Sequence, residues 1–275
     1  MFKIYDLNMK ELPFPEGVKP LDIFVSSVNK RRLTEEFEGR SGTLNYGYDY
    51  GERSVDLSLW LEAHDTIDYR LIRNELYAFF DAHDVFYIEE TRVPSRVLKV
   101  TIDESYIPER INQTHSSVEI SCRTLDSVFW ESKYTTLELH DSGYSATAEK
   151  YGLVDNIDDE KVQYRFTESN FTVYNAGNVI IEPESMLLNI IVNAVQSDNN
   201  FTIRNKTTGE EIVLKRASAG SHFRIQGMVI SLGSITNVFR DTNRRFISLV
   251  PGDNHFEILN GTFEEIRFEF KYLYK

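Results

Sequence analysis

The segment from residue 44 to residue 130 limits the fold most tightly, because two different periodicities follow each other within it. Apolar and polar residues alternate over 55–62, which is typical of a β-strand with one buried face. Helical spacing follows, and Asp65 or Thr66 can cap a helix expected over about 67–80. The apolar residues of this helix are Tyr69, Ile72, Leu76, Phe79 and Phe80.

Further short strands are expected around this helix, which makes the first half a mixed α+β module. They fall at 2–5, 23–28, 85–88, 97–102 and 117–123. In the last of them Val118, Ile120 and Cys122 share one face, so the cysteine is expected in the core. A single cysteine excludes an internal disulfide and fits a reducing compartment.

The second half consists of short apolar segments separated by turns about every eight to twelve residues, which is typical of a β-sandwich or jelly roll. Strands are expected at 163–166, 178–183, 187–192, 200–205, 211–215, 222–226, 228–231, 246–249, 255–259 and 265–273. A linker is expected near 132–145, where the alternation lapses, and an acidic loop at 155–160. We therefore expect two domains, 1–134 and 135–275, in a mainly β protein.

The net charge of −13 argues against specific binding of nucleic acid, because phosphate affinity depends on clustered lysines and arginines. The basic run Lys30-Arg31-Arg32 is followed by Glu35, Glu36 and Glu38, so a solvated loop with local charge pairing is expected there. Neither a membrane span nor a secretion signal is evident, and folding in the cytoplasm is expected.

Common catalytic and cofactor motifs are absent from the sequence, and we expect neither an enzyme, a bound cofactor nor a metal. His64 and His83 bracket the predicted helix, but its ends lie about 20 Å apart, so helix capping is favoured over metal binding. The triplet His222-Phe223-Arg224 could belong to a sugar-binding cluster, although an alternating strand generates such triplets freely.

Several motifs follow one another in a characteristic order along the chain. In the first half these are Phe37–Gly42, the predicted strand and helix, Pro94-Ser95-Arg96 and Ser121–Trp130. In the second half they are Tyr174–Gly177 with Glu182-Pro183, Thr207–Gly209 and Leu249–Asn254. Their order resembles that of the distal tail proteins of long-tailed bacteriophages, and the motifs of the second half are similar to the second domain of that family.

The resemblance implies a hexameric ring at the tail tip of the virion, made in the host cytoplasm. Such a ring is a hub that joins the tail tube protein on one face to a tail-associated lysin or fibre-type protein on the other, with receptor-binding proteins at its rim. DNA passes through the channel without specific binding, and no membrane insertion is implied. The first domain would be a β-sandwich or split-barrel-like ring domain, and the second a galectin-like sandwich.

The sequence departs from this family in two places. Many members close the first domain with Asp-Pro-Tyr, where this chain has Leu125–Phe129. Sugar binding by a galectin-like fold uses a stacking tryptophan, but Trp60 and Trp130 both lie in the first half. We therefore expect the second domain to be a docking platform and not a lectin.

Residues 36–50 resemble the segment that forms an extended hairpin against a neighbouring subunit or the tube in this family. An ordinary turn between strands is the alternative. The candidate interface residues are Arg40, Gly42, Tyr46, Gly47, Tyr48 and Tyr50.

Two other functions stay open at this point. The first is a carbohydrate-binding module that contacts host cell-wall polysaccharide and carries an accessory domain. The second is a hydrolase, which the abundance of carboxylates allows without indicating any particular pair.

Overall fold

The computed structural model describes residues 1–39, 41–142, 157–234 and 237–275. The chain divides into two compact units, Met1–Trp130 together with Lys275 (unit 1) and Glu131–Tyr274 (unit 2). Antiparallel strands dominate both units, so the predicted mainly β fold class is confirmed. The boundary expected from the sequence, after residue 134, lies a few residues beyond this division.

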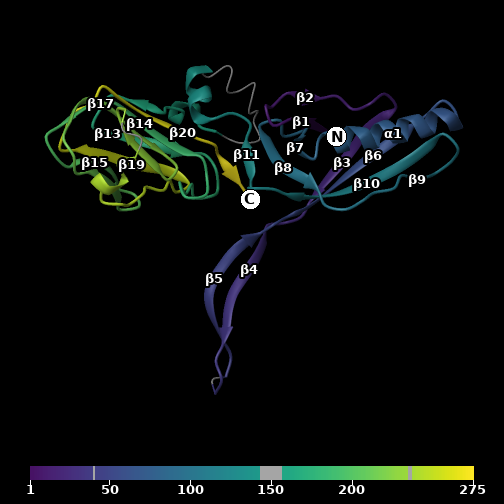
Figure 1. Ribbon diagram of the computed structural model, residues 1–275, viewed down its shortest axis with the longest axis horizontal. Coiled ribbons are helices and arrows are strands. Elements are labelled where there is room, and N and C mark those ends of the chain that lie inside the picture. The colour runs from purple at the N-terminus through teal and green to yellow at the C-terminus, as the bar shows by residue number, and fades with distance from the viewer. Residues whose placement is uncertain (40, 143–156, 235–236) are drawn as a thin grey trace. The chain divides into compact units, whose positions relative to one another are not determined.

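Unit 1, in its described part, is an antiparallel sheet with one α-helix. Hydrogen-bonded neighbours follow the order β2-β1-β7-β8-β10-β6-β3, and β9 pairs with β10. Strands β4 and β5 pair only with each other, and Figure 1 shows them leaving the sheet as a ribbon. The elements are β1 (Phe2–Tyr5), β2 (Glu11–Leu12), β3 (Val18–Val25), β4 (Asn29–Glu36), β5 (Thr43–Gly51), β6 (Ser54–Glu62), α1 (Thr66–Ala82), β7 (Val85–Glu90), β8 (Arg96–Ile102), β9 (Glu109–Arg110) and β10 (His115–Thr124).

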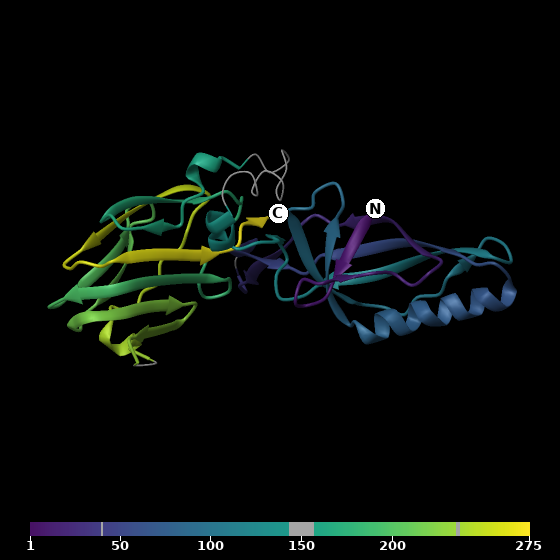
Figure 2. The ribbon, with the colours of Figure 1, turned by 90° about the horizontal axis from the view of Figure 1, so that it is seen from above.

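The core of unit 1 is built on one face of β6. Its alternating apolar residues are 0% exposed, as the period of two predicts, and they are Val55, Leu57, Leu59 and Leu61. Ile72, Leu76 and Phe80 of α1 belong to the same buried cluster. Figure 2 shows α1 running along the sheet of unit 1.

The predicted helix is confirmed together with its start. Asp65 is the N-cap, and its side chain accepts hydrogen bonds from the backbone N–H groups of Ile67 and Asp68, both at 2.8 Å. These two bonds hold the pKa of the Asp65 carboxyl below its ordinary value. His83 is the C-cap residue, and its N–H donates to the carbonyl of Phe80. His64 directly precedes the N-cap, so His64 and His83 lie at opposite ends of α1.

Unit 2 is a sandwich of two antiparallel sheets, ordered β12-β20-β14-β17-β18 and β13-β19-β15-β16. Aromatic pairs link the sheets, with ring centroids 4.9 Å apart for Phe256 and Phe268 and 6.4 Å apart for Phe201 and Phe223. The predicted sandwich is therefore confirmed. The remaining elements are β11 (Trp130–Ser132), η1 (Asp159–Lys161), β12 (Arg165–Phe166), β13 (Asn170–Asn175), β14 (Leu188–Ser197), β15 (Phe201–Asn205), β16 (Glu210–Leu214), β17 (Ser218–Gln226), β18 (Val229–Leu232), η2 (Phe239–Asp241), β19 (Gly252–Leu259), β20 (Glu265–Phe270) and β21 (Leu273–Tyr274), where η marks a 3-10 helix.

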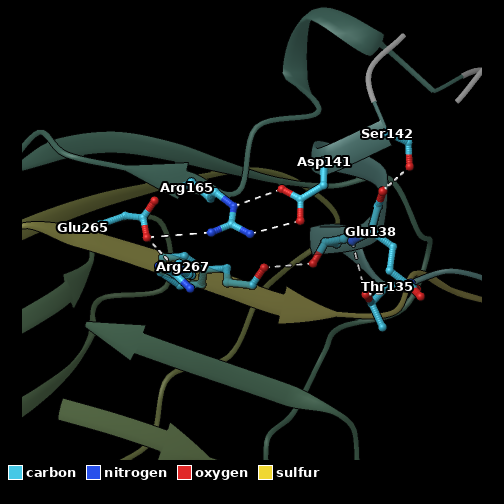
Figure 3. Close-up of polar contacts among 9 residues, drawn as sticks. Thr135, Glu138, Asp141, Ser142, Arg165, Glu265 and Arg267 are labelled. Atoms are coloured by element: carbon cyan, nitrogen blue, oxygen red, sulfur yellow. Dashed lines mark hydrogen bonds and ion pairs between the residues drawn. The ribbon is translucent and has the colours of Figure 1, made fainter. Parts of the chain in front are cut away.

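The expected linker contains a helical turn. Residues 136–142 are helical, and the Thr135 N–H donates to the Glu138 carboxylate at 2.7 Å, which is half of a capping box. Figure 3 shows Arg165 between Asp141 of this helix and Glu265 of β20, with N···O distances of 3.0 and 3.8 Å. Residues 143–145 of the expected linker lie outside the described residues, as do residues 155 and 156 of the expected acidic loop.

Four local predictions are wrong. Two predicted strands, 178–183 and 246–249, are not formed, and these segments share only the isolated bridge between Ile181 and Leu249. Strand β13 is present but was not predicted. The run Lys30-Arg31-Arg32 is part of β4 and not a loop, because pairing with β5 satisfies its backbone groups.

Replacing Leu76 by alanine should destabilise unit 1 by about 2–5 kcal/mol, because the leucine is 0% exposed in the middle of α1. Leu71 on the same helix is 56% exposed, and its alanine variant should change stability by about 0.5 kcal/mol or less. Chemical denaturation of the two variants measures both effects. Equal losses would show that α1 does not pack as described.

Candidate functional site: an exposed hairpin

The clearest candidate for an interaction surface is the hairpin arm, defined as β4, β5 and the tip between them (residues 29–51). Every residue of β4 is exposed, and Gly51 is the one buried residue of β5. Leu33 is 44% exposed, Tyr46 61% and Tyr48 43%. A two-stranded hairpin is at best marginally stable in water, so an arm with aromatic side chains exposed to solvent suits contact with another molecule.

A β-bulge in the arm sets which side chains share a face. The register shifts between Arg32 and Thr34, and opposite this shift Gly47 adopts φ +114°, a conformation that disfavours other residues. The Asn45 side chain accepts the N–H of Gly47 at 3.0 Å and stabilises the bulge. Arg32 lies directly opposite Tyr48 in the register, so these two side chains share one face.

Tyrosines and charged residues contact each other on both faces of the arm. On one face the Lys30 Nζ lies 4.6 Å from the ring centroid of Tyr48, which packs edge-on against Tyr50 at 5.4 Å. On the other, the Tyr46 hydroxyl donates to the Glu35 carboxylate at 3.0 Å, and this hydrogen bond raises the pKa of the tyrosine. These contacts preorganise the arm while leaving its outer surface in solvent.

The root of the arm is fixed in unit 1 by an aromatic contact. Tyr50 packs edge-on against Phe129 with centroids 5.1 Å apart. The Lys275 Nζ lies 5.4 Å from the Tyr50 ring centroid, and a hydrogen bond from this lysine lowers the pKa of Tyr50. Tyr50 therefore anchors the arm within unit 1.

A buried arginine completes the root. The Arg53 guanidinium donates through Nε to the carbonyl of Ser26 at 2.7 Å and through Nη1 to that of Val128 at 3.4 Å. Burial lowers the pKa of Arg53. Its backbone N–H also donates to the hydroxyl of Thr124 at 3.0 Å, so one residue ties β6 to the chain before β4 and to the end of β10.

The structure divides the predicted interface residues by position. Tyr46 and Tyr48 are exposed on the arm, Gly47 forms the bulge and Tyr50 lies at the root. Gly42 borders the tip with φ +92°. Arg40 lies outside the described residues. Arg53 was not predicted as part of the site. Its partners, the carbonyls of Ser26 and Val128, lie far from it in the sequence, and no local pattern indicates them.

A polar groove of about 510 Å³ on unit 2 is a second candidate site. Its Lys161 is paired with Asp253 at 2.9 Å, which raises the pKa of the lysine, and Thr172 bonds to His255 at 3.0 Å. The triplet His222-Phe223-Arg224 does not line this groove, and Phe223 is buried in the sandwich core. The triplet therefore reflects strand alternation.

Neither a metal-binding cluster nor a membrane-spanning helix is present in the described part of the chain. Groups of three or more metal-ligating side chains are not found there, and no described helix is long and apolar enough to cross a membrane. Cys122 is buried as predicted, and burial raises its pKa to about 12, so the thiol stays protonated at neutral pH.

Residues 15–122 match the family of phage tail protein RIFT-related domains, and this range contains the whole hairpin arm. Residues 15–122 are a phage tail domain. The resemblance to distal tail proteins is thereby confirmed for residues 15–122.

One solved structure supports the fold of the whole chain. The Dit protein of phage SPP1, described as a paradigm of hub adsorption apparatus in phages that infect Gram-positive bacteria, is similar with a TM-score of 0.66 and 10% identity, over 99% of this chain and 100% of its own. A chain of the phage p2 baseplate in its activated conformation is similar over 98% of this chain and 97% of its own, with 11% identity and a TM-score of 0.42, too low to inform the fold. Comparison with curated proteins gives no match.

Replacing Arg53 by alanine should destabilise unit 1 by about 1–3 kcal/mol, because the half-buried carbonyls of Ser26 and Val128 lose a charged donor. Arg31, exposed on β4, is the matched control, and its alanine variant should lose about 0.5 kcal/mol or less. Urea denaturation of both variants gives the comparison. An Arg53 variant as stable as the control would contradict the described root.

Proposed function

We propose that this chain is a phage tail protein that forms a homo-hexameric ring at the tail tip and acts as a structural hub. The observation that carries this proposal is the phage tail domain at 15–122 with an exposed arm inside it. A subunit that works alone gains nothing from an arm whose aromatic residues face solvent, whereas an assembling subunit uses it as a contact.

The hub would join the tail tube protein on one face to a tail-associated lysin or fibre-type protein on the other, with receptor-binding proteins at the rim. The likeness to the SPP1 Dit protein, described as part of a hub adsorption apparatus, supports this placement. The sandwich of unit 2 would act as a docking platform. The subunits would be made in the host cytoplasm before assembly.

The arm residues would supply the contacts between subunits in this ring. Each subunit carries a net charge of −13, but charges are screened over about 8 Å at physiological salt, so groups near each contact decide the affinity. A stable contact needs roughly 1,000 Å² of buried surface. Exposed Leu33, Tyr46 and Tyr48 would contribute to it, with Gly42 bordering the tip and Gly47 forming the bulge. Arg40, outside the described residues, is proposed as a further contact residue.

The ring would let DNA pass without binding it and would carry out no catalysis. The acidic net charge of the chain supports the first statement, because bound phosphate needs clustered cations along its path. The protonated Cys122 supports the second, since the single thiol is not available as a nucleophile.

A carbohydrate-binding role is the second candidate, and the polar groove of unit 2 is the observation that favours it. Tyr174 lines this groove, but Lys161 already lies 5.2 Å from its ring centroid, so a sugar would have to displace the lysine. Calorimetry with host wall polysaccharides separates the two roles, because a hub should show no measurable binding of its own.

Shortening the arm should prevent ring formation without unfolding the subunit. In the variant, residues 33–47 are replaced by Asn-Gly, a two-residue turn that reconnects the paired Arg32 and Tyr48. Native mass spectrometry should give six times the subunit mass for the parent chain and the single mass for the variant. An alanine at exposed Leu7, outside the arm, should leave the ring intact.

An unchanged hexamer in the shortened variant would remove the arm from the interface. A parent chain that stays single at every concentration tested, also when its neighbouring tail proteins are present, would contradict the hub itself.

A further inference from the structure

Unit 1 carries a groove that collects arginines although the chain is acidic. The groove has a volume of about 440 Å³ and lies between α1 and residues 107–110. Its lining contains no carboxylate, and the residues are Tyr69, Arg70, Arg73, Tyr77, Ile107, Pro108 and Arg110. We refer to it as the arginine groove.

The walls of the arginine groove are held in place before any ligand arrives. The Arg110 guanidinium lies 4.5 Å from the ring centroid of Tyr69, and its Nη2 donates to the carbonyl of Gln113 at 2.8 Å. Tyr106 fixes the opposite wall by packing edge-on against Tyr77 at 5.6 Å. Burial raises the pKa of Tyr106 to about 12, so this phenol stays neutral.

The positive charge of the arginine groove is not neutralised within the described part of the chain. Some other cations of unit 1 are paired, such as Lys3 with Glu11 at 2.8 Å and Lys19 with Glu62 at 2.5 Å. Arg70, Arg73 and Arg110 form no such ion pair among the described residues. Guanidinium groups suit planar anions, so these three indicate a carboxylate or phosphate ligand.

The Nε atom of Arg73 is buried and makes no hydrogen bond within the described residues. Its guanidinium bonds at Nη2 to the amide oxygen of neighbouring Asn74, at 3.2 Å. The guanidinium of Arg73 therefore has no carboxylate partner among the described residues.

The surroundings of the arginine groove favour a protein segment over nucleic acid. Ile107, which lines the groove, is 84% exposed. Phosphodiester backbones gain little from aliphatic side chains, whereas an acidic segment with apolar residues uses both parts of the site.

The tip of the hairpin arm has the complementary chemistry. Glu36 and Glu38 are exposed and form no ion pair among the described residues, and Phe37 between them is 45% exposed. The eight residues of β4 span about 26 Å. Their full exposure means that the tip does not fill a site on its own subunit.

We propose that the arginine groove binds the acidic tip, Glu35–Glu38, of the hairpin arm of a second copy. The inference rests on the proposed function, because that function already uses the arm as a subunit contact. Each copy then offers one arm and one groove, so the contact is heterologous. Such contacts repeat head to tail and close into a ring when the rotation allows.

Charge reversal in full-length chains tests the pairing. The groove variant carries Arg70→Glu and Arg73→Glu, and the tip variant carries Glu36→Lys and Glu38→Lys. Each should need about tenfold more protein to assemble, as judged by sedimentation velocity, since losing close charge pairs costs at least this factor. Carrying all four substitutions together should restore assembly to within about threefold of the parent.

Control substitutions separate the pairing from general charge effects. Arg92→Glu and Glu16→Lys make the same changes at exposed positions outside the groove and the tip, and both should assemble like the parent. The inference would be overturned if the groove variant assembled like the parent. It would also be overturned if the variant with all four substitutions assembled no better than the groove variant or the tip variant.

A peptide experiment keeps the inference separate from ring formation. The probe is a dye-labelled peptide of residues 29–51 closed by a disulfide through Asn29→Cys and Gly51→Cys, which lie opposite each other in the register. It should bind the full-length chain and lose about tenfold in affinity for the groove variant. Binding to a chain that never assembles would contradict the ring and leave the groove inference standing.

If the parent assembles but does not bind the peptide, the groove inference is contradicted and the ring stands. A labelled DNA duplex that binds the parent and loses affinity in the groove variant, while the peptide does not bind, would also overturn the inference.

Discussion

Burial of one face of β6 is the constraint on which the rest of unit 1 depends. β6 pairs with β3 on one side and β10 on the other, and α1 covers its apolar residues. Both candidate contact elements extend from this centre. The arm is tied to it through Arg53, just before β6, and one wall of the arginine groove continues from β9, which pairs with β10. A loss of the β6 core would therefore remove arm and groove together.

The residues that hold the arm to unit 1 lie at its root, whereas the residues available for binding lie towards its tip. Its root is held by Tyr50 against Phe129 and by Arg53 against two carbonyls, whereas the tip contacts little of its own subunit. Ordering a flexible side chain or loop on binding costs free energy, and the bulge at Gly47 with the Tyr46 contact to Glu35 reduces this cost in advance. An arm built in this way can bind a neighbour without weakening the fold that carries it.

Local patterns in the sequence predict much of this fold, and long-range features escape them. The β6 alternation, the Asp65 cap, α1 and the buried Cys122 follow from spacing within a few residues. β4 could not be predicted as a strand, because all of its residues are exposed and no apolar period marks it. The arginine groove was equally hidden, since Arg110 meets Arg70 and Arg73 only through the pairing of β9 with β10. For the same reason the partners of Arg53 are visible only in the folded chain.

Electron microscopy of the purified chain tests the central claim most directly, because it shows subunit number and contacts in one image. We expect a closed sixfold annulus in which the arm of each subunit ends on α1 of the next. Particles of one subunit, or rings in which the arms point away from every neighbour, would contradict it.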